Sequence, residues 1–401
     1  MALSRGALLV AVLGASWLGG RALHVDDVYL TPAYHYFILA LLAIGLYGST
    51  RDIDVGELRS NRRTVLLALS IGVMAKVVFI AAVMLVLYPE PASLVLGVAV
   101  AQIDPLAVAS AQRRRHMSSS TRAVLNAWAA FDDPVTVLLT VYLSMFALRA
   151  AGIGSSADAV TSPAAAFVVD LALNLLFACA AYAVWWVARR TGLPSRLAKA
   201  DLVARAGQVA VAVVALVYAV FGVSQSLMLG IALIGLFFRP YLAWRRTATG
   251  FVFGALLVAT GALGVVLAGT TELLTAGTVV KGVVLGIAAY VAQMLAGGLL
   301  SRGRGRFDRL YLALSQQNGL TAIVLALVLE PDFPGAVAVI APAIVVTNVL
   351  YGVGSAVVTR LEKQAPVPVP VPVWVMVAAH MNIRATRARR ALSAEPARPK
   401  L

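Results

Sequence analysis

The chain has 401 residues, of which 61% are hydrophobic and only 13% are charged. That charged share is about half the ~25% of soluble domains, so the composition excludes a disordered chain and argues against a water-soluble globule. The single cysteine, Cys179, excludes an intrachain disulfide framework and a cysteine-built metal site. The length instead accommodates roughly a dozen membrane-spanning helices of ~20 residues each.

Apolar stretches of suitable length follow one another along the chain. We expect each to form a spanning helix, which gives an all-α polytopic membrane protein with about 12 transmembrane helices. The first stretch is also compatible with a cleaved signal peptide, because a basic residue, Arg5, precedes a short apolar run. The stretches lie near 7–22, 32–49, 64–88, 91–112, 122–148, 163–188, 202–223, 225–238, 248–269, 275–300, 308–329 and 335–358.

The basic residues fall in every second loop. Such a pattern is typical of cytoplasmic loops, so we expect an integral protein of the cell (inner) membrane with both termini in the cytoplasm. The net charge of +15 then reflects topology, and we expect no nucleic acid partner. All but four of the 33 Lys and Arg are Arg5 or lie in loops 51–63, 113–122, 189–205, 239–246 and 302–309 or in the tail from Arg360.

The composition of the tail changes at Ala365. Alternating Pro and Val over 366–373 favours an extended polyproline II spacer. The segment 374–392 then ends in four arginines, which could bind anionic lipid. A solvated, disordered tail is the alternative interpretation.

Charged residues deep inside the expected spans are Asp104, Asp132, Asp133, Lys76 and Lys281, whereas Asp170 sits early in span six, nearer an interface. Each costs roughly 2.5–3.5 kcal/mol on insertion scales, so each needs a partner or a function. Asp132 is ten residues beyond Arg122, or ~15 Å at the helical rise, which is the middle of a ~30 Å membrane core. Two adjacent carboxylates at this depth cannot easily both stay charged, so they should titrate as a pair and exchange protons for cations. The alternative is a pair of buried aspartates satisfied by helix hydrogen bonds.

Two expected spans contain polar interruptions, at 102–105 and at 315–321. Proline removes a backbone donor and disfavours helix at the preceding residue, and unwound backbone at membrane depth is tolerated only where it lines a site or a packed interface. The interruptions occupy the middle of spans three to five and of spans ten to twelve, whose topologies are inverted. The sequence therefore predicts two inverted repeats with two broken, crossing helices and a transport site between them.

These motifs resemble those of the monovalent cation/proton (Na⁺/H⁺) antiporters. The segment QIDPLAV at 102–108 is similar to their Ala-Thr-Asp-Pro-Val-Ala-Val motif, and AFDDP at 130–134 is similar to their Asn-Asp or Asp-Asp motif. Lys281 lies 38 residues before Gly319 and resembles the family's lysine that precedes its second broken helix. The family's threonine is replaced by Ile103, which removes one oxygen ligand. The resemblance favours the Asp-Asp, electrogenic-like branch.

The resemblance implies roles for the charged residues. Asp133 would bind the monovalent cation and the proton, and Asp132 would pair with a lysine or share the proton. Asp104 would support the site together with Lys281. The spacing of the motifs favours Lys281 as the partner lysine, but depth favours Lys76, because at the helical rise Lys76 is ~20 Å from Arg63 and Lys281 ~31 Å from Arg302.

The resemblance also implies a core domain that moves against a second bundle, which forms the interface of a homodimer. The expected divisions are N-terminal panel helices at 1–62, the first core repeat with span six at 63–200, a linker with panel helices at 201–274, the second core repeat at 275–360 and the tail at 361–401. No enzymatic activity and no cofactor are expected. Two other functions stay open, namely a cation-coupled symporter of a small organic solute and a non-transporting membrane scaffold or sensor.

Overall fold

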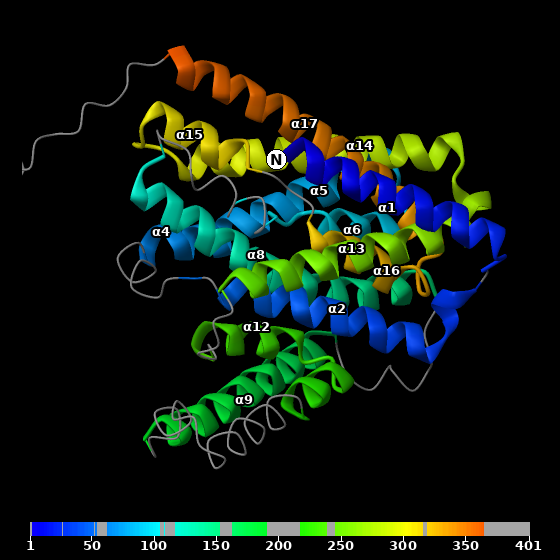
Figure 1. Ribbon diagram of the computed structural model, residues 1–401, viewed down its shortest axis with the longest axis horizontal. Coiled ribbons are helices and arrows are strands. Elements are labelled where there is room, and N and C mark those ends of the chain that lie inside the picture. The colour runs from blue at the N-terminus through cyan, green and yellow to red at the C-terminus, as the bar shows by residue number, and fades with distance from the viewer. Residues whose placement is uncertain are drawn as a thin grey trace, which may run out of the picture. The chain divides into compact units, whose positions relative to one another are not determined.

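The computed structural model describes residues 2–25, 27–51, 53, 62–104, 108, 117–152, 163–190, 217–238, 245–315 and 319–364. These residues form a helical protein without β-strands (Figure 1). The chain divides into two compact units, residues 1–358 and 359–401. Only the end of one helix is described in the second unit, so the proposed spacer and basic segment of the tail lie outside the described residues.

Most of the described residues in the expected spans are helical. Within the part of the chain that the structure describes, seven helices are long and apolar enough to cross a membrane, which makes this an integral membrane protein. Most of the stretch 202–223 lies outside the described residues, so the total of about 12 spans stays a prediction. The helices are α1 (Ala2–Ala22), α2 (Pro32–Arg51), α4 (Arg62–Leu67), the π-turn η2 (Ala68–Gly72), α5 (Val73–Leu87), α6 (Pro91–Ala99), α8 (Ser119–Ala150), α9 (Pro163–Arg190), α12 (Met228–Phe237), α13 (Arg245–Gly269), α14 (Ala276–Leu300), α15 (Arg306–Ala313), α16 (Leu320–Leu329) and α17 (Ala336–Gln364).

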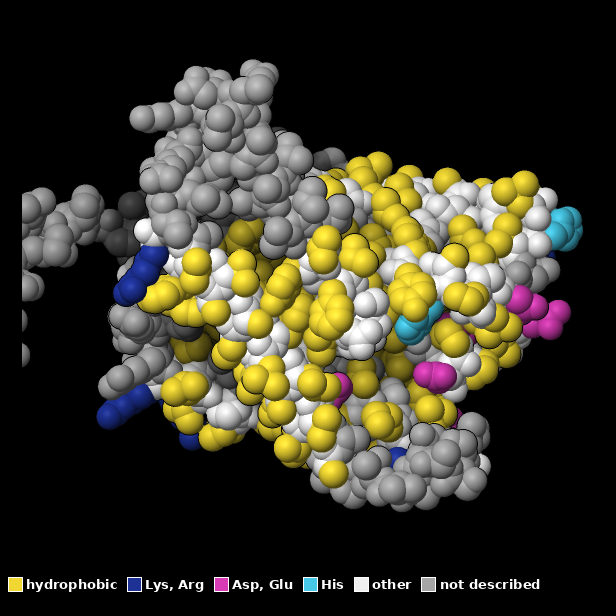
Figure 2. Space-filling model, turned by 90° about the horizontal axis from the view of Figure 1, so that it is seen from below, with side chains coloured by type: hydrophobic (Ala, Val, Ile, Leu, Met, Phe, Trp, Pro, Cys, Tyr) yellow, Lys and Arg dark blue, Asp and Glu magenta, His cyan; other side chains and the backbone are white. Residues whose placement is uncertain are grey.

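The outer surface of the bundle is hydrophobic. Large apolar side chains such as Val86 (80% exposed) and Leu176 (66% exposed) point away from the protein. Figure 2 shows such side chains over most of the described part of one face, with Lys and Arg mainly towards one end and Asp and Glu towards the other. An apolar belt between two polar ends is the surface expected of a bundle whose sides face lipid.

Both predicted helix interruptions are present in the described residues. Helix α6 ends at Ala99, and residues 101–104 that follow it are not helical. Helix α15 ends at Ala313, and α16 begins only at Leu320. The relation of the two trios as inverted repeats, and the finer division into core and panel domains, stay predictions.

The interrupted helices pack among the long ones. Helix α5 lies against α6 and α14, α6 also contacts α8, and α16 packs on α2 and α13. At the α14–α15 contact, Gly297 lies against the backbone of Leu312, where a side chain could not fit. This packing brings the end of α6 and the start of α16 to the middle of α8.

A buried carboxylate joins α16 to α17. Glu330, which follows α16, is fully buried and accepts hydrogen bonds from the N–H groups of Gly335 (2.8 Å) and Val337 (2.6 Å). Burial raises the pKa of Glu330, and the two N–H donors oppose that shift. The carboxylate therefore caps the first turn of α17, where the N-terminal N–H groups have no partner within the helix.

We expect Glu330→Ala to lower the stability of the protein by about 1–3 kcal/mol, because two buried N–H groups lose their acceptor. The measurement is a thermal melt in detergent. Glu272→Ala, which removes an exposed carboxylate, is the matched control and should leave the melting temperature nearly unchanged. Equal melting temperatures for both variants would contradict the capping role.

Candidate ion-binding site

Helix α8 carries two adjacent aspartates into the middle of the bundle. Asp132 and Asp133 are 0% and 2% exposed. Successive residues of an α-helix point about 100° apart, so the two carboxylates meet different neighbours. Thr136, one turn further along, hydrogen-bonds the backbone carbonyls of Asp132 and Asp133 at 2.9 Å, and Pro134 has no N–H for the helix ladder. The local sequence thus places both carboxylates next to a proline that cannot donate a helix hydrogen bond and one turn before a threonine that bonds their backbone carbonyls.

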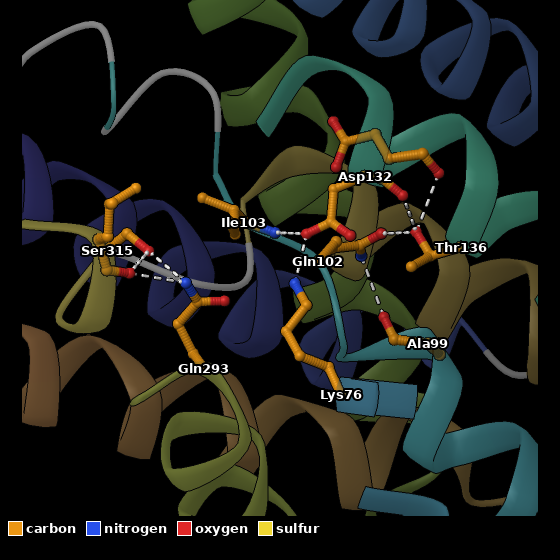
Figure 3. A network of polar contacts seen from close by, with 10 residues as sticks. Lys76, Ala99, Gln102, Ile103, Asp132, Thr136, Gln293 and Ser315 are labelled. Atoms are coloured by element: carbon orange, nitrogen blue, oxygen red, sulfur yellow. Dashed lines mark hydrogen bonds and ion pairs between the residues drawn. The ribbon is translucent and has the colours of Figure 1, made fainter. Parts of the chain in front are cut away.

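Asp132 forms a buried ion pair with Lys76 of α5. The Lys76 Nζ atom lies 2.5 Å from Asp132 Oδ2, and both side chains are fully buried. The same oxygen accepts the Ile103 N–H at 2.9 Å, from the extended segment after α6 (Figure 3). The Lys76 ammonium also lies 5.1 Å from the centre of the Trp128 ring. The second oxygen, Asp132 Oδ1, is buried and has no hydrogen-bond partner among the described residues.

Lys281 forms its ion pair with Glu90, and Asp132 has Lys76 instead of the lysine that the family resemblance favoured as its partner; a role of Lys281 in the site stays a prediction. Its ammonium lies 2.7 Å from Glu90 Oε2, and the Glu90 side chain is 63% exposed. The Lys281 ammonium also lies 5.3 Å from the centre of the Tyr88 ring. The difference follows from the position of each lysine along its helix. Lys281 lies in the second turn of α14, which begins at Ala276, whereas Lys76 is fully buried within the bundle. Depth arithmetic was the better guide to the partner lysine.

Asp133 faces the first turn of α16. Its carboxylate is hydrogen-bonded by the side chain of Thr321, and it interacts electrostatically with Asp104. Asp104, 7% exposed, lies against Gly319, whose added Cβ would fall 2.5 Å from Asp104 Oδ1. Gly319 is the N-cap of α16, so the positive end of that helix meets the Asp104 carboxylate. The two carboxylates and one hydroxyl come from three separate segments of the chain.

Neutral side chains fix the two extended segments. Gln102 accepts the Thr136 hydroxyl at 2.8 Å and donates to the Ala99 carbonyl at 3.0 Å, which ties the end of α6 to α8. Gln293 of α14 donates to Ser315 Oγ at 2.8 Å and to the Leu312 carbonyl at 3.0 Å, which holds the end of α15 (Figure 3). These bonds supply partners for carbonyl groups in the last turns of α6 and α15, which have none within their own helix.

We expect Gly319→Ala to reduce transport at least about tenfold, because a 1 Å misplacement at a functional site can cost about a hundredfold. The new methyl group would push the Asp104 carboxylate aside, whereas the φ of Gly319 (−95°) itself accepts alanine. Gly298→Ala in α14, where nothing lies within 4 Å, is the matched control. Initial transport rates of the two purified variants decide between them, and an unimpaired Gly319→Ala would contradict the packing argument.

Sequence reasoning predicted that Asp104, Asp132 and Asp133 lie at membrane depth, and the structure brings them together. It ranked Lys76 second and gave no role to Thr321, although this threonine is the last residue of the predicted interruption at 315–321. Other residues of the predicted motif and interruption lie outside the described residues, namely 105–107 and 316–318.

The comparisons with known proteins bear on the fold. No protein-family model matches the chain. No curated protein matches it either. Among solved structures, it is similar to the sodium proton antiporter MjNhaP1 from Methanocaldococcus jannaschii at pH 8, with a TM-score of 0.58 and 17% identity over 87% of this chain and 98% of that one. A structure of MjNhaP1 from an electron microscopy map gives a TM-score of 0.50 and 17% identity over 91% and 99% of the two chains. At this identity, the likeness establishes a shared fold.

Proposed function

We propose that this protein is a secondary antiporter that exchanges Na⁺ or another monovalent cation for protons by alternating access at Asp132 and Asp133. The observation that carries the proposal is the pair of adjacent, buried carboxylates between two interrupted helices. Buried charges within a membrane protein are costly, and they mark ion pathways and proton relays. The fold shared with a sodium proton antiporter supports the same assignment.

The two carboxylates have different tasks in this proposal. Asp132 already has a counter-ion in Lys76, so its charge is balanced without a transported ion. Asp133 contacts the neutral hydroxyl of Thr321 and the acidic side chain of Asp104, which leaves its negative charge to be balanced by a proton or by a cation. A buried carboxylate that must always hold either a proton or a cation couples the proton flux to the cation flux.

The surface supports a defined orientation. Lys and Arg gather mainly towards one end of the bundle in Figure 2, and basic ends face the cytoplasm in membrane proteins. We therefore extend the proposal to a cell-membrane protein with cytoplasmic termini. The homodimer implied by the family resemblance, and its electrogenic-like stoichiometry, belong to the same proposal.

Transport by the purified protein in proteoliposomes tests the proposal. We expect an outward or inward gradient of Na⁺ or Li⁺ to drive proton movement in the opposite direction, measured with a trapped pH-sensitive dye. Proton movement in the same direction as the cation, dependent on an added organic solute, would favour a symporter. The absence of any cation-driven proton flux across the alkali cations would favour a scaffold or sensor.

A further inference from the structure

The hydroxyl of Thr321 is well placed for a task beyond helix packing. Thr321 is the second residue of α16 and is 3% exposed. Many buried threonines of this protein bond a carbonyl of their own helix, as Thr140 does to Thr136 at 2.7 Å. Thr321 instead bonds the carboxylate of Asp133 on another helix, α8. A hydroxyl has one hydrogen to donate and two lone pairs, so this bond leaves oxygen lone pairs available to a cation.

A second observation concerns the neighbouring aspartate of α8, Asp132. Asp132 Oδ1 is a fully buried carboxylate oxygen without a hydrogen-bond partner among the described residues. A buried acceptor of this kind is costly unless a proton, a water or an ion reaches it. The adjacent Asp133 and the facing Asp104 add carboxylate oxygens. The donor set is therefore composed of oxygens alone, which suits hard cations.

The start of α16 contacts both the Asp104 and the Asp133 carboxylates. Gly319 lies against the Asp104 carboxylate, and Thr321, two residues later, contacts Asp133. One helical turn thus fixes the separation between the two carboxylates. Because these residues are almost fully buried, a cation that enters must lose most of its water and needs replacement ligands from the protein.

We infer that Thr321 is a ligand of the transported cation, which completes with Asp133 and Asp104 an all-oxygen site for a dehydrated alkali cation. This inference rests on the proposed function and adds a residue that decides cation affinity. Ile103, next to Asp104, offers only its backbone to the site and donates its N–H to Asp132. The hydroxyl of Thr321 therefore supplies the site with a neutral side-chain oxygen that Ile103 does not have.

The inference is tested by Thr321→Val, which keeps the shape of the side chain and removes the oxygen, and by Thr321→Ser, which keeps the oxygen. We expect Thr321→Val to raise the KM for Na⁺ at least about tenfold, in line with the loss of affinity when metal-site partners are removed, with a smaller change in kcat. Thr321→Ser should have a KM for Na⁺ close to that of the wild type. Thr140→Val, which removes a hydroxyl bonded within its own helix, is the control and should resemble the wild type.

Calorimetric titration of the detergent-purified proteins with NaCl separates the inference from the proposed function. If the wild type binds Na⁺ but does not exchange it for protons, the proposed antiport function is wrong. Weaker Na⁺ binding by Thr321→Val alone would still support Thr321 as a ligand of the cation. An unchanged Na⁺ affinity in Thr321→Val would overturn the inference. Equal losses of Na⁺ affinity in Thr321→Val and Thr321→Ser would also overturn it. Serine keeps the hydroxyl oxygen and valine does not, so a ligand role requires the two variants to differ. If Thr321→Val does not fold, Thr321→Ala takes its place.

Discussion

Asp133→Asn is expected to abolish cation/proton exchange while the protein stays folded. Asparagine has nearly the shape of aspartate and can still accept the Thr321 hydrogen bond, but it cannot gain or lose a proton and has no charge for a cation. The expected loss is to the background of protein-free liposomes. The measurement is Na⁺-driven proton flux in proteoliposomes, with size-exclusion elution and the melting temperature as tests of folding.

The matched control for this variant is Asp170→Asn. Asp170 is a half-buried aspartate in α9, so the substitution removes the same charge at a position away from the site. It should keep exchange near the wild-type rate. Wild-type exchange in Asp133→Asn would show that this carboxylate does not carry the ion or the proton.

Lys76→Ala is expected to have the second largest effect. It leaves Asp132 buried without its counter-ion, and breaking a buried ion pair from one side costs about 3–5 kcal/mol when the remaining group stays charged. Asp132 will therefore hold a proton more strongly. Exchange should fall at least about tenfold, the equivalent of about 1.4 kcal/mol, or its pH profile should move towards alkaline values.

Lys281→Ala removes the other intramembrane lysine and is the control. The Lys281 side chain is 11% exposed, but its partner Glu90 is 63% exposed, so solvent reaches the pair and its contribution lies nearer the about 0–1 kcal/mol of surface ion pairs than that of a fully buried one. We expect a small effect on both exchange and stability. The pH profile of exchange for the two variants decides the assignment, and a larger shift in Lys281→Ala would restore the lysine that the family resemblance favoured.

Much of the fold could be predicted from the sequence because lipid imposes simple rules. An apolar stretch long enough to cross the membrane must satisfy its backbone internally, so the stretch at 122–148 and the observed helix α8 agree within a few residues. The breaks before Asp104 and Gly319 were visible because proline, glycine and amides interrupt otherwise apolar runs. The ends of helices were less predictable, since caps such as Ser118 on α8 act locally.

The site was less predictable than the helices, because its contacts join segments far apart in the chain. The position of a carboxylate along one helix indicates depth, and depth, adjacency and the motif at 130–134 together identified Asp132 and Asp133. The choice between Lys76 and Lys281 depended on where each helix begins. The contact of Thr321 with Asp133 depended on the packing of α16 against the site. No periodicity in a single span encodes those relations, which arise only when the helices assemble.

The buried Glu330 illustrates the same limit. In the sequence it ends an apolar run and precedes a loop, and nothing there singles it out. In the structure it is fully buried and caps α17 through two N–H groups. Its burial depends on the turn at 331–335 that folds the chain back over it.

The central claim is that cation and proton compete for Asp133. The most direct test is proton release by the detergent-purified protein in weakly buffered solution when NaCl is added, measured with a pH-sensitive dye against choline chloride. The account predicts that Na⁺ displaces protons from the wild type and that Asp133→Asn releases none. Na⁺ binding by the wild type without proton release, or equal release by Asp133→Asn, would contradict it.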